Sequence, residues 1–574
     1  MKLTNDATIF TSIFAWSMSL FLLSTYFSLR WGDKSIVYIA FFFLFLSVWN
    51  AIFKLKGRSP LGLLIIFPII PHFVFMFRQG GLPLFVTDQN YWVQLESMVL
   101  ENHKWSLGMG LFRAQVYSYY PLTALWGSLF QIISGFPVVL IVAIFSVLNG
   151  ILPPLFYFML IKDFLKEDAK LLIYTSTFIF MLNYQFLFLD SLFAYESMAI
   201  IFSLMIIYLF NKGRDFRNAS ALLFLLVISL VLTHHFTVIS TILILSSFYL
   251  LSYFQHRGRS HKSILLILIL AFLSYSMFVA VSQFGFYADA IIKFFSTINK
   301  GSGYHRIYPP DIYRLEPYEV AITIVGQMVL VFFGFVGFIK PSKNKSDFFF
   351  KGLFLIGALY FILSIAANFV SPQLYTDLPI RTMVPSFLLM APTISRGILG
   401  KYQEKKFLLL YTTLLSAFLI LNPFYRLVDM PIPTQTALQT SYWIKSHIPM
   451  GTEVLPSQIG FVADAVCSYG HVLDFFGPFT KQFFLPSFYN YFFNGNLHEF
   501  MKNFSLKYFI LYNNYNEWNV KWWIMPYINS SISYNFMEYI SAANDKLNSN
   551  VHMLRIYDLG EISIYFLSDK TLES

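Results

Sequence analysis

Ionisable side chains stand in this sequence where long apolar runs begin or end. Asp88 is the first of them, in the segment LPLFVTDQNYWVQLESMVLENHKWSLG (82–108), which follows an apolar run. A carboxylate at such a position can act as a general base that takes a proton from a hydroxyl or an amine. Arginine and histidine side chains can hold a phosphate through charge-assisted hydrogen bonds. The other candidates of these two kinds are Asp190, Glu196, His234, His235, His305, Arg306 and Arg381.

The runs between these residues indicate the fold class. Of the 574 residues, 57% are hydrophobic and 12% are charged, whereas a soluble domain has roughly 25% charged residues. Many runs have about the 20 residues that a bilayer-spanning helix needs. We therefore expect an α-helical polytopic membrane protein with about 13 transmembrane helices, the first of them retained and not cleaved as a signal peptide. The predicted spans are 7–29, 35–53, 60–77 (interrupted by Pro68 and Pro71), 136–161, 171–190, 191–211, 219–235, 236–254, 263–283, 319–339, 352–370, 380–397 and 407–425.

The distribution of basic residues predicts the orientation of these spans. If the N-terminus is cytoplasmic, the inner tail and loops hold 21 of the 31 Lys and Arg residues of 1–425, but only 7 of its 18 Asp and Glu residues. Basic loops mark the cytoplasmic side of a membrane protein. We therefore expect a multi-pass protein of the cell membrane with a cytoplasmic N-terminus. The net charge of +10 then reflects topology, and no nucleic-acid partner is expected.

The chain changes character after residue 425. Residues 426–574 hold 9 basic and 12 acidic residues, and no run there is long enough to span a bilayer. Alternating apolar residues and turn signals predict short strands instead. The predicted elements are a helix over 440–451, strands over 452–456 and 507–512, and a hairpin over 552–567 that turns at Asp558-Leu559-Gly560. The expected domains are a transmembrane domain over 1–425, with outer loops at 79–120 and 284–318, and a small α/β extracytoplasmic domain over 426–574.

On this topology the candidate residues gather at the outer ends of the predicted spans. Polar groups near a membrane are costly and usually face a cavity. A site at this boundary suits a substrate with a lipid tail and a polar head. The expected roles are a catalytic base for Asp88; donor-phosphate binding for Arg381, His235 and Arg306; acceptor or metal binding for Glu196, Asp190 and His234; and sugar stacking for Tyr117, Tyr120 and Tyr304.

Several candidates also have a purely structural interpretation. Asp88 can cap the helix that starts near Asn90. His234 and His235 are adjacent, so on a helix their side chains point roughly 100° apart and at most one faces a site. Tyr117 and Tyr120 also fit an interfacial aromatic belt.

The segment that follows Asp88 has the pattern of an amphipathic surface helix. Its charged residues recur on one side and its large apolar residues on the other. We expect Glu96, Glu101 and Lys104 to face water, and Trp92, Leu95 and Val99 to face lipid.

Several short motifs together resemble one family. A large first outer loop with Asp88 resembles the integral-membrane glycosyltransferases of the GT-C superfamily, which include protein mannosyltransferases, aminoarabinose transferases and oligosaccharyltransferase catalytic subunits. The resemblance implies a polyprenyl-phosphate-linked sugar donor, a protein, glycan or lipid acceptor, and anomeric inversion. It also implies that Asp88 is the catalytic base or binds a divalent metal such as Mg or Mn, and that Arg381 meets the lipid phosphate. The motifs are YSYYPL (117–122), SLFAYESMAI (191–200), LTHHFT (232–237), LPIRTMVPS (378–386) and LRIYDLGEISIYFL (554–567).

Two other functions stay open at this stage. An oligosaccharyltransferase would carry a WWDYG motif, whereas KWWIMPY (521–527) lacks the Asp-Tyr-Gly, so we favour transfer of a single sugar. A flippase or transporter of lipid-linked sugars would show internal repeats and paired broken helices. No repeat is evident in the sequence, and the interrupted third span has no counterpart later in the chain.

Overall fold

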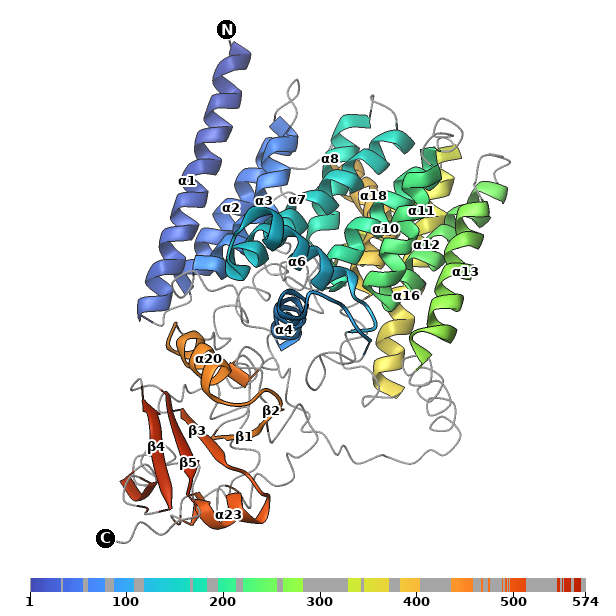
Figure 1. Ribbon diagram of the computed structural model, residues 1–574. Coiled ribbons are helices and arrows are strands. Elements are labelled where there is room, and N and C mark those ends of the chain that lie inside the picture. Colours follow the sequence, from blue (N-terminus) through green and yellow to red (C-terminus); the bar gives the residue numbers. More distant parts are fainter. Residues whose placement is uncertain are drawn as a thin grey trace.

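The apolar runs fold into helices that pack side by side, and a small sheet lies at one end of this bundle (Figure 1). The N-terminus lies at the opposite end. The computed structural model describes residues 2–31, 35–54, 60–77, 87–107, 118–165, 169–182, 195–212, 220–254, 262–281, 329–341, 345–370, 382–402, 435–457, 466–467, 473–474, 488, 491–492, 494, 496–512, 545–547, 550, 552–558 and 562–568.

The helices of the bundle follow the predicted spans closely. They are α1 (Lys2–Trp31), α2 (Ser35–Lys54), α3 (Leu61–Phe77), α7 (Val138–Leu165), α8 (Lys170–Met181), α10 (Tyr195–Lys212), α11 (Ser220–Thr233), α12 (His235–Phe254), α13 (Lys262–Phe278), Val329–Ile339, α16 (Lys345–Val370) and α18 (Met383–Tyr402). The thirteenth predicted span, 407–425, lies outside the described residues.

Length and apolarity single out two of these helices as membrane spans within the described part of the chain. Leu140–Leu165 and His235–Tyr253 are both long enough and apolar enough to cross a bilayer. Eight further apolar helical stretches, counted over the residues whose side chains the structure describes, have between 10 and 17 residues. The number of about 13 spans therefore stays a prediction.

The third helix differs from its prediction. Pro68 and Pro71 were expected to interrupt it, yet α3 is one continuous helix from Leu61 to Phe77. The two prolines are three residues apart and so lie on one side of the helix. Proline is tolerated inside membrane helices because neighbouring groups satisfy the backbone that it frees.

Close backbone contact joins the helix Val329–Ile339 to α18. A Cβ atom added to Gly337 would collide with the carbonyl oxygen of Thr393, and one added to Gly397 would collide with that of Phe333. Small residues allow helices in membranes to approach in this way. The glycines therefore fix how closely these two helices pack.

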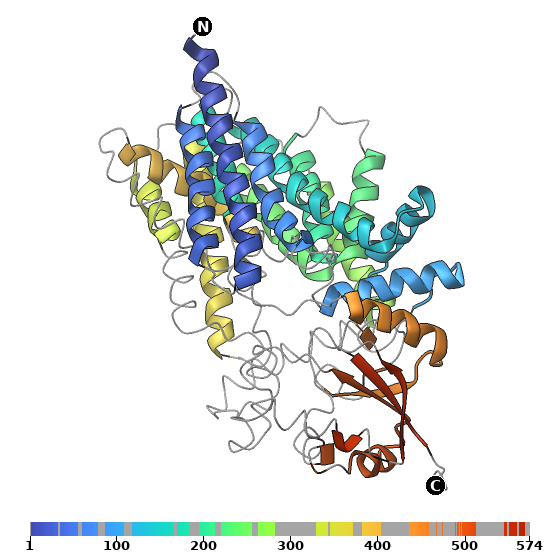
Figure 2. The ribbon, with the colours of Figure 1, turned by 90° about the vertical axis from the view of Figure 1, so that its left-hand side faces the viewer.

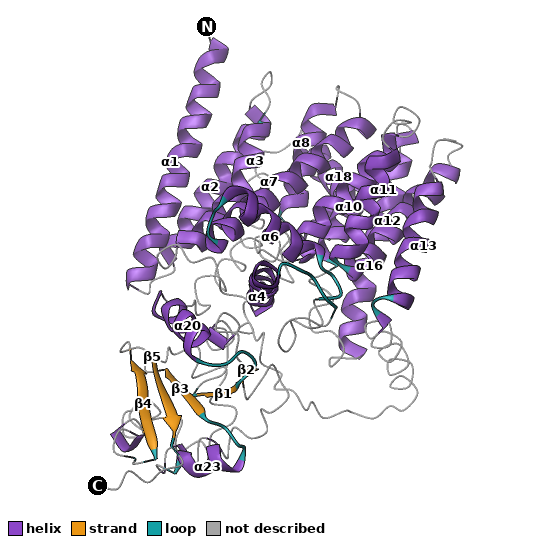
Figure 3. Ribbon diagram, viewed as in Figure 1, coloured by secondary structure: helices purple, strands orange, loops and turns teal. Residues whose placement is uncertain are grey.

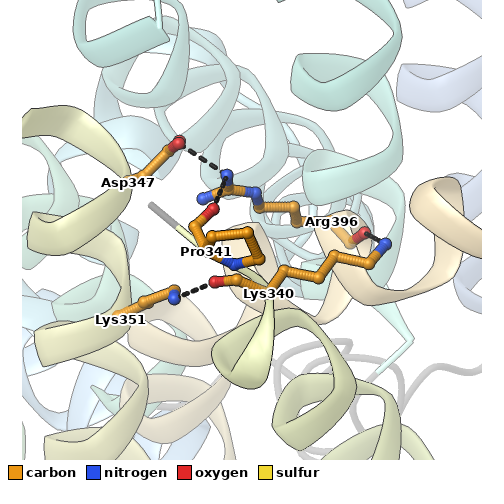
Figure 4. A network of polar contacts seen from close by, with 5 residues as sticks. All are labelled: Lys340, Pro341, Asp347, Lys351 and Arg396. Atoms are coloured by element: carbon orange, nitrogen blue, oxygen red, sulfur yellow. Dashed lines mark hydrogen bonds and ion pairs between the residues drawn. The ribbon is translucent and has the colours of Figure 1, made fainter. Parts of the chain in front are cut away.

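Polar contacts join the same elements at the end of the bundle away from the sheet (Figure 4). Arg396 of α18 donates to the carboxylate of Asp347 at 2.5 Å and to the carbonyl of Pro341 at 3.4 Å. Lys340 donates to the carbonyl of Arg396 at 3.3 Å, and Lys351 donates to the carbonyl of Lys340. The cationic side chains thus satisfy carbonyls near helix ends, where cations are favoured.

The C-terminal residues form a five-stranded mixed sheet of order β2-β1-β3-β5-β4 (Figure 3). The antiparallel pair β4–β5 is the predicted hairpin, with Leu554 opposite Phe566. The predicted helix of 440–451 starts earlier and is α20 (Gln435–His447). The other elements are β1 (Glu453–Pro456), β2 (Leu473–Asp474), α23 (Leu497–Asn503), β3 (Tyr508–Tyr512), β4 (Met553–Asp558) and β5 (Ile562–Leu567).

Two helices pack on each other near the end of the bundle that faces the sheet. These are α4 (Thr87–Asn102), which lies across the end of the bundle, and α6 (Leu122–Ser134), which packs on it and was not predicted (Figures 1 and 2). α4 begins before Asp88, which is therefore in its first turn and is not the residue that caps it. A negative charge in a first turn still favours the helix dipole.

The predicted water-facing and lipid-facing sides of α4 were wrong in part. Glu96 was expected in water but is 0% exposed. Trp92 and Leu95 were expected in lipid but are buried among protein side chains, including Tyr120 and Ala124. These residues are buried because α6 packs on α4 and covers a surface that the sequence pattern predicted to be exposed. Three further residues complete this comparison: Val99 is also buried, while Glu101 and Lys104 are exposed.

Candidate functional site

The first turn of α10 and the junction of α11 with α12 bring two predicted site residues together. Glu196 lies in that first turn, and His234 lies between the end of α11 and the start of α12. Nε2 of His234 is 3.6 Å from Oε1 of Glu196, and the two side chains are 1% and 10% exposed. This separation is too long for a hydrogen bond but allows charge attraction once the imidazole is protonated.

A hydroxyl group orients the imidazole of this pair. Nδ1 of His234 and Oγ1 of Thr237 are 2.7 Å apart and form a hydrogen bond. Thr237 follows His234 by three residues, so the two side chains lie on the same side of a helical turn. With Nδ1 held by Thr237, Nε2 is the ring nitrogen that faces Glu196.

A cavity opens beside the pair, between α10, α12 and α18. The lining is mainly apolar, and its polar residues come from α10, from α12 and from His234 just before α12. Two serines of the lining are hydrogen-bonded to further hydroxyl groups. Ser203 bonds Thr241 at 2.7 Å, and Ser240 bonds Tyr360 of α16 at 3.1 Å. The lining residues are Glu196, Ile200, Ser203, Leu204, His234, Phe236, Thr237, Ser240, Ile244, Val384, Pro385 and Leu388.

His235 has a different set of neighbours from His234, although the two ring centres are 4.8 Å apart. Its ring packs against Tyr120, with the ring centres 5.0 Å apart, and it does not line the cavity. Tyr120 also contacts Tyr275 and is 3% exposed, so a sugar could stack on it only after a rearrangement.

The remaining predicted site residues cannot be placed relative to this cavity. Asp88 belongs to the first turn of α4, but its side chain lies outside the described part of the structure. Two segments of the cavity lining do continue toward predicted residues: Val384 follows Arg381 by three positions, and Glu196 follows Asp190 by six. Lying outside the described residues altogether are Tyr117, Asp190, Tyr304, His305, Arg306 and Arg381.

The described residues do not by themselves form a metal site. Among them no group of three or more His, Cys, Asp or Glu side chains lies close enough to hold an ion. Glu196 and His234 offer one carboxylate and one imidazole, whereas protein metal sites use three or more ligands of these types. The pair alone therefore has too few ligands to hold Mg or Mn.

Sequence reasoning missed the hydroxyl groups around the pair. Thr237 stands in the same LTHHFT motif as His234, and Ser203 follows Glu196 by seven residues, which is two helical turns. Both spacings were visible in the sequence. They place polar side chains on the same helix faces as the two ionisable residues, and the structure shows those faces lining one cavity.

Comparison with known proteins gives similarities of structure and none of sequence. No protein-family model and no curated protein matches the chain. The apo oligosaccharyltransferase of Archaeoglobus fulgidus is similar over 81% of this chain and 70% of its own, with 10% identity and a TM-score of 0.48.

Two further solved structures were determined with ligands. Oligosaccharyltransferase AglB of Archaeoglobus fulgidus, in complex with an inhibitory peptide and a dolichol-phosphate, is similar over 89% of this chain and 74% of its own, with 12% identity and a TM-score of 0.40. ArnT of Cupriavidus metallidurans, bound to undecaprenyl phosphate, is similar over 88% of this chain and 97% of its own, with 8% identity and a TM-score of 0.36.

Proposed function

We propose that this chain is a glycosyltransferase of the cell membrane, which moves one sugar from a polyprenyl-phosphate-linked donor to a protein, glycan or lipid acceptor outside the cell. The observation that carries the proposal is the buried pair of Glu196 and His234 beside a mainly apolar cavity that also has hydroxyl groups in its lining. A donor with a polar sugar phosphate and an apolar tail is matched by such a lining.

Glu196 and His234 can carry charge, and can accept or donate protons, in a site of low dielectric. A protonated His234 is attracted by Glu196, and Thr237 holds the ring in a fixed direction. In this proposal Glu196 and His234 receive the acceptor, and Asp190 at the same outer turn assists them. Burial strengthens each of these interactions relative to water.

The reaction is a direct displacement at the anomeric carbon of the donor. The carboxylate of Asp88 takes the proton of the acceptor hydroxyl or amine as the new bond to the anomeric carbon forms. The bond from that carbon to the phosphate oxygen breaks, and the polyprenyl phosphate leaves with the electron pair. Arg381 and Arg306 stabilise the leaving phosphate, and the attack from the opposite side inverts the anomeric configuration.

The distribution of charge along the helices around the cavity supports an enzyme over a transporter. In α10 the charged residues are Glu196 in the first turn and Lys212 in the last. α12 has His235 at its start and no other charged or histidine residue. A transporter is expected to place its substrate and ion sites near the middle of the membrane. These two helices place their ionisable groups at their ends.

The experiment is sugar transfer by the purified protein from a panel of radiolabelled polyprenyl-phosphate sugars. Wild-type protein is compared with Asp88→Asn and Glu196→Gln. The matched control is Asp163→Asn, because Asp163 is also a carboxylate at a helix end but pairs with Lys212 at 2.9 Å at the opposite end of α10. We expect transfer by the wild type and the control, and a loss of about 100-fold or more in Asp88→Asn.

The outcomes separate the functions. Transfer that survives Asp88→Asn would keep the glycosyltransferase and remove Asp88 from its centre. Donor binding without transfer from any donor would contradict the proposal and favour a flippase. Transfer of a complete glycan to asparagine, with no transfer of single sugars, would favour an oligosaccharyltransferase.

A further inference from the structure

The carboxyl group of Glu96 is a feature of the α4–α6 interface that the proposed function does not use. The residue is 0% exposed, and neither of its carboxyl oxygens has a hydrogen-bond partner among the described residues. Within the same described part, the buried hydroxyl of Thr123 on α6 also lacks a partner. A buried polar group without a partner costs free energy, and a buried charge costs much more.

Glu96 has room at this interface because the residue that faces it is glycine. A Cβ atom added to Gly127 of α6 would lie 2.5 Å from Oε2 and 3.2 Å from Oε1 of Glu96. The neighbouring Ser128 donates a hydrogen bond to the backbone carbonyl of Glu96 at 3.3 Å. The carboxyl group is therefore seated against the backbone of α6.

The surroundings of Glu96 keep its side chain protonated at neutral pH. Burial alone raises the pKa of Glu96 from 4.5 to about 8. α6 carries no acidic or basic side chain, and the exposed Glu101 is the next charged residue along α4. The other ionisable groups around this core, on the neighbouring elements, are Tyr119, Tyr120, Tyr275, Glu196, His234 and His235.

We propose that Glu96 is a positioning residue: in its neutral form it holds α4 against α6, and its ionisation releases α4 together with the first turn that carries Asp88. The inference rests on the proposed function, in which Asp88 is the catalytic base. Asp88 and Glu96 are eight positions apart, which corresponds to about 12 Å along the helix, so both belong to one rigid element. Release of α4 then removes the base from its place and ends the reaction.

The direction of the pH dependence follows from linkage. Docked α4 keeps the proton on Glu96 up to a pH of about 8, whereas a released helix would lose it near the ordinary pKa of 4.5. The released state therefore binds fewer protons in this range. The docking of α4 on α6 therefore weakens as the pH rises from about 4.5 to about 8. Outside that window, docking does not change with the ionisation of Glu96.

Thiol labelling tests the docking without any measurement of transfer. Cys467 is the single cysteine of the chain, so Cys467→Ser gives a background without thiols. Met98→Cys then places one thiol on α4 at a position that is 6% exposed in the parent. Its rate of modification by a water-soluble reagent is measured between about pH 5 and about pH 8.5, with and without Glu96→Gln.

The labelling rate of the protein with Glu96 is divided by the rate of the protein with Glu96→Gln. This ratio removes the pH dependence of the reagent itself. We expect the rate with Glu96 to rise over the rate with Glu96→Gln by up to about tenfold per pH unit, because one proton is lost on release. Glu101→Gln is the matched control, since Glu101 is an exposed carboxylate on the same helix, and it should follow the parent. Glu96→Met, an unbranched apolar replacement of similar length, takes the place of Glu96→Gln if that variant does not fold.

Transfer activity tests the link from docking to Asp88. Relative to Glu96→Gln, transfer by the wild type should fall on the alkaline side in parallel with the rise in labelling. A labelling ratio that stays within twofold over the whole pH range overturns the proposal. A labelling ratio that rises while the transfer ratio stays flat overturns the positioning role. If no variant transfers sugar, the proposed function fails, and the labelling still decides whether Glu96 controls docking.

Discussion

Nε2 of His234 lies 3.6 Å from Oε1 of Glu196, although the two residues are 38 positions apart in the sequence. Neither side chain is in contact with bulk water, since they are 1% and 10% exposed. This pair joins the start of α10 to the start of α12 at the edge of the cavity, so changes to either residue should be felt by any substrate bound there.

Substitution Glu196→Gln should lower sugar transfer by about 10- to 100-fold. The change keeps the shape of the side chain and removes the charge that attracts a protonated His234, and the expected loss corresponds to about 1.4–2.7 kcal/mol. The measurement is kcat/KM for the donor that the wild type uses. Activity within twofold of the wild type would remove Glu196 from the site, and Asp163→Asn should remain at the level of the wild type.

Substitution Thr237→Val should lower transfer by about 2- to 10-fold, because it removes the hydroxyl that bonds Nδ1 of His234. Thr237→Ser keeps a hydroxyl at the same place and should restore most of the loss. The control is Ser247→Ala on the same helix, because Ser247 is buried and its hydroxyl bonds only the backbone carbonyl of Leu243 among the contacts described. Equal losses in the valine and serine variants would show that packing, and not the hydrogen bond, explains the effect.

Substitution Gly337→Ala should destabilise the protein by about 1–3 kcal/mol, because its new methyl group would meet the backbone of Thr393. Gly62→Ala is the matched control, since a methyl group there meets nothing within 4 Å. Thermal unfolding of the two variants in the same detergent measures the difference. A Gly337→Ala protein that unfolds at the temperature of the control would mean that the two helices can move apart at little cost.

Lys445 of α20 forms an ion pair with Glu101 of α4, with side chains that are 33% and 45% exposed. A double-mutant cycle should give a coupling of only about 0.2–1 kcal/mol, which falls as salt is added. The variants are Glu101→Gln, Lys445→Met and their combination, compared by thermal unfolding. A coupling well above 1 kcal/mol would mean that the pair is more shielded from water than its exposure indicates.

Much of the helical part could be predicted from the sequence because a membrane helix is defined by a local property. A run of about 20 apolar residues predicts a helix without knowledge of its neighbours. The helices α11 and α12 accordingly begin and end within a few residues of the predicted spans. The β4–β5 hairpin was also predicted, because alternation and a turn signal are local.

The environment of Glu96 could not be predicted in the same way. Glutamate on an amphipathic helix faces water in most proteins, and the sequence around it contains nothing that says otherwise. What buries it is Gly127, 31 residues later, on a helix that the sequence reasoning did not identify. Burial of this kind depends on a partner surface, so a pattern within one segment does not reveal it.

For the candidate site, the sequence argument succeeded where it concerned geometry within one helix. Of the adjacent residues His234 and His235, only His234 lines the cavity, while His235 contacts Tyr120. The hydroxyl groups were missed because serine and threonine are common in membrane helices and give no signal by type alone. Only the packing of α10 against α12 makes Ser203 and Thr241 partners at 2.7 Å.

The position of α4 also bears on how this protein can be rebuilt. One helix carries Asp88 in its first turn, packs into the bundle through Glu96, and meets α20 through Glu101. The part of the chain from α20 to β5 therefore contacts the helix that carries Asp88. A chimera that takes this part of the chain from another protein must also take a matching surface of α4. Otherwise the foreign part can disturb the first turn of α4, which carries Asp88.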